Sequence, residues 1–311
     1  MSPRVLVTGA TGFIGRHALA PLVARGFQVH AVARRAPPRA AEEVRWHAAD
    51  LLRAGEAEAV VRAVRPTHLL HLAWYVEHGS FWRSPENLGW VGATLQLARA
   101  FAEAGGTRAA FAGTCAEYEW GHALCSEVGT PLRPATLYGS CKLAAWQALD
   151  GFARQAGFSA AWGRVFLLYG PHEAPARLVP SIVRSLAAGQ PARCSHGAQL
   201  RDFLHVADVG AAFAALLDGE VAGPVNIGSG QPVTVAEVAR KIAARMGRPE
   251  LLELGALASP PGDPAALVPA VARLRGEVGW TPRWGLDEGL GDVIAWWRAH
   301  PAAESQNQAA R

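Results

Sequence analysis

The chain has 311 residues, of which 50% are hydrophobic and 18% are charged, and it carries a formal net charge of +4. This size and composition exclude an intrinsically disordered chain and a small disulfide-dependent scaffold, and they predict one large domain joined to a smaller one. The arginines are dispersed rather than gathered in a basic run, so we expect a small-molecule ligand and no nucleic-acid partner.

The four cysteines lack the paired spacing of a zinc site, so we expect reduced thiols and no metal centre. No charge-free run approaches the roughly 18 residues needed to span a bilayer. No N-terminal stretch combines a basic region, an apolar core and a cleavage site. We therefore expect a cytoplasmic protein with no membrane partner.

The N-terminal half alternates buried strands with amphipathic helices. The first strand is expected at 5–7, and the apolar residues after it recur at helical spacing, which predicts a strand, a tight turn and a helix. Further strands are expected at 29–33, 44–48, 68–73, 109–113 and 160–166, and helices at 56–64, 94–104 and 143–156. This alternation predicts an α/β fold, a Rossmann-type doubly wound parallel sheet covered on both faces.

Beyond about residue 165 the alternation stops, and glycine and proline accumulate. We expect an NADP-binding Rossmann domain over residues 1–166, with a returning segment near 200–225, and a smaller C-terminal α/β substrate domain over residues 167–199 and 226–300. Within the smaller domain, helices are expected at 236–246 and 286–297 and a loop at 259–264. Residues 301–311 have little to bury and are expected to fray.

A glycine-rich loop, residues 8–15, lies between the first strand and the first helix. Gly9 permits the tight turn, Gly12 lets the backbone approach a pyrophosphate, and Gly15 allows close helix packing, while the helix N-terminus attracts the anion. The alternative is a merely structural turn. The residues expected to contact a dinucleotide here are Gly9, Thr11, Gly12, Phe13, Ile14 and Gly15.

The end of the second strand indicates which dinucleotide is bound. An acidic residue that holds the ribose of NAD usually stands there, but this chain has Ala33 followed by Arg34 and Arg35. Two guanidiniums suit the 2′-phosphate of NADP, so we expect NADP(H), with Arg34 as the principal contact and NAD(H) as the alternative. Both arginines could instead be solvated surface charges. After the third strand, Asp50 and Leu51 are expected to contact the adenine.

Tyr138 and Lys142 lie four residues apart, a spacing that places them on one face of a helix. Lys142 and Lys241 are the only lysines of the chain, which makes a chance pairing unusual. An ammonium beside a phenol lowers the phenol's pKa from about 10, so we expect Tyr138 to carry a proton in catalysis. The alternative is a surface tyrosine beside a solvated lysine.

These motifs resemble those of the extended short-chain dehydrogenase/reductases, the group of nucleotide-sugar epimerases, dehydratases and 4-ketoreductases. Five more segments carry the resemblance, at 71–73, 169–171, 201–209, 225–230 and 279–283. It implies that Thr114 hydrogen-bonds the reacting oxygen, that Tyr138 gives or takes its proton, and that Lys142 holds the cofactor ribose and tunes Tyr138. It also implies that Arg201 contacts the substrate diphosphate and that the chain forms a homodimer.

The residues after the fourth strand are also candidates for the site. We expect Leu72, Ala73 and Trp74 to line the cofactor, and Tyr75 and His78 to contact the substrate. The aromatic stretch 74–82 could instead pack between the two domains. Arg177 is a further expected substrate contact. Asp202, Asp208 and the strand histidine His71 are expected to be structural.

Departures from the family pattern narrow the reaction. Cys115 and Ala116 stand where dehydratases carry an Asp-Glu pair, so we expect no 4,6-dehydratase activity. Leu167 replaces an asparagine common in nucleotide-sugar enzymes, which weakens that substrate assignment. We predict an NADP-dependent reductase of a nucleotide-diphosphate-linked deoxy-4-ketohexose. An NAD-dependent nucleotide-sugar 4-epimerase is the alternative, and a catalytically silent dinucleotide-binding sensor is a less favoured third reading.

Overall fold

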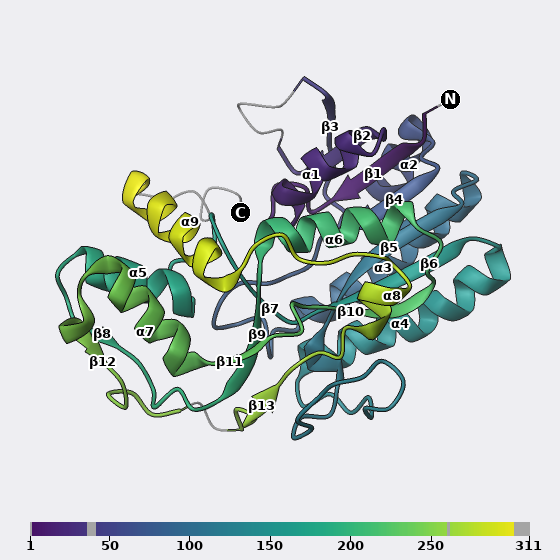
Figure 1. Ribbon diagram of the computed structural model, residues 1–311. Coiled ribbons are helices and arrows are strands. Elements are labelled where there is room, and N and C mark those ends of the chain that lie inside the picture. The colour runs from purple at the N-terminus through teal and green to yellow at the C-terminus, as the bar shows by residue number, and fades with distance from the viewer. Residues whose placement is uncertain (1, 36–41, 260–261, 302–311) are drawn as a thin grey trace.

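A seven-stranded sheet forms the larger part of the protein. Figure 1 shows the computed structural model, which describes residues 2–35, 42–259 and 262–301. The strand order is β10-β6-β5-β4-β1-β2-β3, and every neighbouring pair is parallel. The strands are β1 (Arg4–Thr8), β2 (Gln28–Ala33), β3 (Val44–Ala48), β4 (His68–His71), β5 (Arg108–Thr114), β6 (Ser159–Val165) and β10 (Gly223–Ile227). The prediction of a doubly wound parallel sheet is confirmed.

Helices cover both faces of this sheet. Successive side chains of a strand point to opposite faces, and Leu6 packs with one set of helices while Val5 and Val7 pack with the other. The first set is α2 (Glu56–Val64), α3 (Glu86–Glu103) and α4 (Leu137–Ala156). The second set is α1 (Gly15–Ala24) and α6 (Val206–Asp218), which lie side by side in Figure 1. Each face of the sheet thus has its own apolar core.

A third core lies in the C-terminal part, beside the large sheet. Its strand β9 (Leu200–His205) pairs in parallel with β7 (Leu167–Tyr169) and β13 (Ala266–Leu267), and antiparallel with β11 (Pro232–Thr234). The helices α5 (Leu178–Ala187), α7 (Val235–Met246) and α9 (Leu286–Ala299) gather on this side and enclose a separate apolar cluster. The short elements are η1 (Cys115–Glu117), β8 (Ala192–Arg193), η2 (Pro249–Leu251), β12 (Leu252–Glu253) and α8 (Ala272–Gly276).

The predicted elements of the first half are all present, and three of their boundaries differ from the predicted ones by two residues or more. β4 ends at His71, two residues before the predicted end, and α3 and α4 begin eight and six residues before their predicted starts. Glycines in the first turns of both helices have a low helix propensity, so the sequence predicted later starts. In the structure, capping and packing determine where the two helices begin. The side chain of Thr136 caps α4 by accepting a hydrogen bond from the backbone of Gly139 at 3.1 Å.

The C-terminal part contains elements that the sequence patterns did not predict, namely α5, α6, β9 and β10. The division into a Rossmann domain and a substrate domain at the predicted boundaries stays a prediction. The predicted frayed tail, apart from Pro301, and residues 260–261 of the predicted loop lie outside the described residues. Among the described helices, none combines the length and the apolar character that a membrane span requires. The four cysteines are free thiols.

Candidate active site

The glycine-rich loop packs too tightly to admit side chains at two of its glycines. Gly9 has a φ of +68°, and a Cβ atom there would lie 2.7 Å from the backbone nitrogen of Ala73. A Cβ atom on Gly15 would lie 2.1 Å from the carbonyl oxygen of Gly9. The loop leads directly into the N-terminus of α1, and the N-terminus of a helix attracts an anion such as a phosphate. This cradle fits the pyrophosphate of a dinucleotide.

The other predicted cofactor residues follow strand ends at the same edge of the sheet. Arg34 and Arg35 come after β2 and are exposed. Asp50 comes after β3, where it accepts a hydrogen bond from the backbone of Leu52 at 3.2 Å. The loop after β4 places Ala73 against Gly9. Because the carboxyl ends of parallel strands meet at one edge, these residues border one binding region.

Thr114 and Tyr138 meet at this edge. Thr114 ends β5 and Tyr138 lies in the first turn of α4, and both side chains are buried. Burial raises the pKa of Tyr138 above its ordinary value, while a hydrogen bond with the side chain of Thr114 and the charge of Arg177 lower it. Burial outweighs the other two, so the phenol is neutral in the unliganded protein. The two groups can therefore share a proton with an oxygen placed between them.

Lys142 lies one turn farther along α4, but it does not acidify Tyr138. Its ammonium donates to the carbonyl oxygen of Ala112 at 2.7 Å and lies 3.8 Å from the ring centre of Trp74. Burial lowers the pKa of Lys142 to about 7, and the carboxylate of Glu117 opposes this shift. The prediction that Lys142 lowers the pKa of Tyr138 is wrong for this structure, because the phenol's own burial dominates.

A buried network behind Thr114 escaped the sequence analysis. The carboxylate of Glu117 accepts hydrogen bonds from the backbone of Thr114 at 2.8 Å and from the indole of Trp162 at 2.9 Å. It also pairs with Arg164 at 2.7 Å, and both members of the pair are 0% exposed. Thr114 and Glu117 form a capping box, and the Thr-x-x-Glu spacing is a signal from which Glu117 could have been predicted. The network holds the end of β5 in place.

Asn226 continues this network into the C-terminal part. The hydroxyl of Tyr118 accepts from Arg164 at 3.1 Å and donates to the amide oxygen of Asn226 at 2.7 Å. The amide nitrogen of Asn226 donates to the carbonyl oxygens of Cys125 and Ala270. The 225–230 motif noted in the sequence thus has a structural role, since it ties the loop after β5 to the segment before α8.

The two predicted arginine contacts have different surroundings. The guanidinium of Arg201 is buried and donates to Asp263 at 2.5 Å and to the carbonyl oxygen of Leu200 at 2.8 Å. The guanidinium of Arg177 lies 5.6 Å from the ring centre of Phe81, which in turn packs edge-on against Tyr138 at 5.0 Å. Arg177 therefore lies near Tyr138 by way of Phe81, and Arg201 is paired with the carboxylate of Asp263.

The aromatic stretch after β4 packs mainly against Tyr138 and Lys142. The rings of Phe81 and Trp82 pack edge-on against the ring of Tyr138, with distances of 5.0 and 5.8 Å between the ring centres. The hydroxyl of Tyr75 bonds within its own loop, to Glu77 at 2.9 Å and to Ser80 at 2.9 Å. His78 is exposed. Packing between the two domains is therefore not the main role of this stretch, and contact of Tyr75 and His78 with substrate stays a prediction.

The residues expected to be structural are so. His71 is buried between the hydroxyls of Thr8, at 2.7 Å, and Thr94, at 3.0 Å, and burial lowers its pKa to about 3. Asp202 accepts from the backbone and hydroxyl of Ser229 at 2.7 and 2.9 Å. Asp208 accepts from the backbone N–H groups of Arg283, the last residue of the 279–283 motif, and of Trp284.

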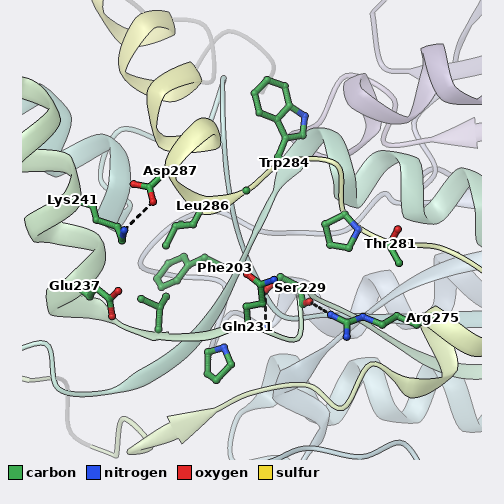
Figure 2. Close-up of a pocket in the computed structure, with 14 residues that line it drawn as sticks. Phe203, Ser229, Gln231, Glu237, Lys241, Arg275, Thr281, Trp284, Leu286 and Asp287 are labelled. Carbon is green, nitrogen blue, oxygen red and sulfur yellow. Dashed lines mark hydrogen bonds and ion pairs between the residues drawn. The ribbon is translucent and has the colours of Figure 1, made fainter.

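A cavity of about 630 Å³ lies between helix α7, strand β11 and the part of the chain that runs from α8 to the start of α9. Figure 2 shows the residues that line it. An ion pair between Lys241 and Asp287, at 2.9 Å, and a hydrogen bond from Arg275 to the carbonyl oxygen of Ser229, at 2.8 Å, join residues of its walls. None of the predicted catalytic or cofactor residues lines this cavity. The candidate active site is therefore a different part of the molecule.

Comparisons with known proteins agree with this geometry. Residues 5–228 match the model of the NAD dependent epimerase/dehydratase family. The chain is 25% identical to UDP-glucuronic acid decarboxylase 1 of Xenopus tropicalis, over 98% of this chain and 74% of that protein. It is 27% identical to UDP-glucose 4-epimerase of Streptomyces lividans, over 97% and 98% of the two proteins.

A solved structure, MoeE5 in complex with UDP-glucuronic acid and NAD, superposes with a TM-score of 0.84 at 33% identity and covers 95% of this chain and 99% of that one. The resemblance to the extended short-chain dehydrogenase/reductases is confirmed. The chain belongs to the NAD-dependent epimerase/dehydratase family.

Proposed function

We propose that the protein is a nucleotide-sugar 4-epimerase, which inverts the hydroxyl at C4 of a hexose linked to a nucleoside diphosphate. The observation that carries this proposal is the buried contact between Thr114 and Tyr138 at the sheet edge beside the glycine cradle. A nicotinamide cofactor, when bound, supplies and accepts the hydride. The relatives named above act on UDP-sugars, which supports a nucleotide-linked substrate here.

The roles of the chain's own residues follow from their surroundings. Tyr138, once it has released its own phenol proton, takes the C4 hydroxyl proton and returns it after inversion, and Thr114 holds the reacting oxygen by hydrogen bonding. Lys142 reaches the cofactor ribose from its place on the face of α4. The positive charge of Arg177 lowers the pKa of Tyr138 and favours its deprotonation. Arg201 binds the diphosphate, which competes with Asp263 for the guanidinium.

Elimination of water is disfavoured because no free carboxyl group follows Thr114. Burial raises the pKa of the Cys115 thiol to about 12, so it is a poor proton donor at neutral pH. The carboxylate of Glu117 is occupied by Arg164, Trp162 and the Thr114 backbone. A 4,6-dehydratase would need an acid and a base at positions 115 and 116, where this chain has Cys115 and Ala116, and the neighbouring Glu117 is not available for that work.

A second candidate function is the reduction of a nucleotide-linked 4-ketohexose by NADPH. Arg34 and Arg35, exposed at the end of β2 with Ala33 before them, favour it, because guanidiniums suit a 2′-phosphate and no carboxylate is there to hold the ribose of NAD. Cofactor titrations with wild type, Arg34→Ala and Arg35→Ala test this point. Selective loss of NADP affinity in Arg34→Ala supports a preference for NADP. Equal affinity of the wild type for NAD and NADP refutes that preference.

The experiment that separates the two functions follows the sugar and the cofactor together. Purified protein is incubated with UDP-glucose, UDP-glucuronic acid and dTDP-4-keto-6-deoxyglucose, with NMR of the sugar and absorbance of the nicotinamide. Inversion at C4 with no net cofactor consumption supports the epimerase. Stoichiometric NADPH oxidation by the keto sugar supports the reductase. Cofactor uptake without turnover of any of the sugars refutes both and supports a silent dinucleotide-binding protein.

We also propose a homodimer that forms through α3 and α4, the helices that the family resemblance implicates. Light scattering during size-exclusion chromatography measures the mass directly. Because one chain has a mass of 32.9 kDa, a dimer is expected near twice that value, and a mass of one chain contradicts the proposal.

A further inference from the structure

The indole of Trp74 lies directly against the ammonium of Lys142. Trp74 is the third residue after β4, and only 8% of its surface is exposed. The ammonium lies 3.8 Å from the ring centre, whereas the next aromatic ring, that of Trp162, lies at 5.8 Å. A cation this close to the face of an indole is attracted by the negative potential of the ring, and exclusion of water strengthens the attraction.

Asn87 holds Trp74 in this place. Its amide oxygen accepts from the indole nitrogen of Trp74 at 2.8 Å, and its amide nitrogen donates to the carbonyl oxygens of Phe81 at 2.7 Å and Ser84 at 2.8 Å. Asn87 lies in the first turn of α3 and is 0% exposed. All three hydrogen bonds go to one loop, residues 74–84, so a single buried amide fixes its conformation.

The same loop also reaches the catalytic tyrosine. The backbone N–H of Tyr138 donates to the carbonyl oxygen of Trp82 at 3.2 Å, and the rings of Phe81 and Trp82 pack edge-on against the phenol. One end of the loop therefore contacts Lys142, and the other end contacts Tyr138. The aromatic residues in it serve the catalytic pair rather than a sugar ring alone.

We propose that Trp74, anchored by Asn87, is a positioning residue that holds the Lys142 ammonium at the cofactor site by a cation–π contact. The inference rests on the proposed role of Lys142 in the active site. The carbonyl of Ala112 supplies one hydrogen-bond acceptor for the ammonium, and the indole face supplies a second favourable contact without a formal charge. Trp74 thus keeps Lys142 aligned and charged in a site closed to water.

Glu117 and His71 are the titratable groups whose charges interact with that of Lys142. The carboxylate of Glu117, from η1, favours the ammonium. His71, from β4, has its pKa lowered by burial and by the charge of Lys142, so it is neutral near pH 7 and adds no repulsion. Burial works against the ammonium and brings the pKa of Lys142 to about 7, which places its titration in an accessible range.

The test uses the fact that the chain has only two lysines, Lys142 and Lys241. Protein labelled with ¹³C at lysine Cε gives two NMR signals, and each can be titrated without substrate or turnover. Lys241, which is paired with Asp287, is the internal reference. The variants are Trp74→Leu, which removes the π face, Trp74→Phe, which keeps one, and Asn87→Ala, which frees the indole. Trp146→Leu is the matched control, because Trp146 is buried in the same core on α4 but is not among the rings that contact Lys142.

Removing a contact that favours the ammonium should lower its pKa. We expect the Lys142 midpoint to fall by about one pH unit in Trp74→Leu, by less in Asn87→Ala, and by only a few tenths in Trp74→Phe. Trp146→Leu should leave it within about 0.2 of wild type. An unchanged midpoint in Trp74→Leu, the same shift in Trp146→Leu, or a rise toward the ordinary lysine value would overturn the inference. A protein with no epimerase or reductase activity that still shows the predicted shifts would disprove the proposed function alone.

Discussion

The buried ion pair behind Thr114 offers a strong test of how the site is built. In Glu117→Gln the amide oxygen can still accept from the backbone of Thr114 and from Trp162, so the shape of the site is kept. The guanidinium of Arg164, 0% exposed, then has no counter-charge. Breaking a buried pair from one side costs about 3–5 kcal/mol, so we expect the free energy of unfolding to fall by that amount.

Urea unfolding followed by circular dichroism measures this loss, and the control is Asp150→Asn, which breaks an exposed pair with Arg154 on α4. That control should cost less than about 1 kcal/mol. The double variant Glu117→Gln with Arg164→Met removes both charges and should recover much of the lost stability. If Glu117→Gln costs under about 1 kcal/mol, or the double variant is no more stable than the single one, the assigned role of the pair is wrong.

Three further changes test separate parts of the structure. Tyr138→Phe removes the proton carrier, so turnover should fall by about 10²- to 10⁴-fold while cofactor affinity, measured by fluorescence titration, stays near wild type; unchanged turnover contradicts the role. Burial raises the pKa of Glu173 from 4.5 to about 8. Between these two pH values the folded protein holds a proton that the unfolded chain releases, so the free energy of unfolding falls as the pH rises from 4.5 to about 8. Glu173→Gln should therefore be about 2–4 kcal/mol more stable than wild type at pH 8 and equal to it near pH 4; a difference that does not depend on pH refutes this. Gly15→Ala places a Cβ atom 2.1 Å from the carbonyl oxygen of Gly9 and should abolish cofactor binding, whereas Gly276→Ala, which meets no atom within 4 Å, should not; normal binding by Gly15→Ala contradicts the cradle.

Features that depend on short stretches of sequence were predictable. The glycine loop and the spacing of Tyr138 and Lys142 follow from local geometry, and the structure places them at the expected ends of elements. Asn87, by contrast, acts through partners on a loop whose path depends on packing, and Arg164 meets Glu117 across 47 residues of chain. No local pattern encodes such contacts, although the Thr-x-x-Glu spacing marked one partner of the pair.

The prediction that Lys142 lowers the pKa of Tyr138 was wrong for the same reason, because it depended on the whole fold. The spacing of Tyr138 and Lys142 predicted an acidified phenol, but the sign of a pKa shift depends on burial, which the whole fold determines. In the C-terminal part, α6 is buried on nearly every side, so its apolar residues show no clear helical stripe. The strands β7, β8, β11, β12 and β13 have only two or three residues each, which is too short for a periodic pattern.

The central claim is that Thr114 and Tyr138 carry out proton transfer at C4 of a nucleotide-linked sugar. The most direct measurement is NMR of the sugar after incubation of UDP-glucose or UDP-glucuronic acid with wild type and with Tyr138→Phe. The account predicts inversion at C4 by wild type, which Tyr138→Phe slows by at least about 10²-fold. Inversion at equal rates by both proteins would contradict it.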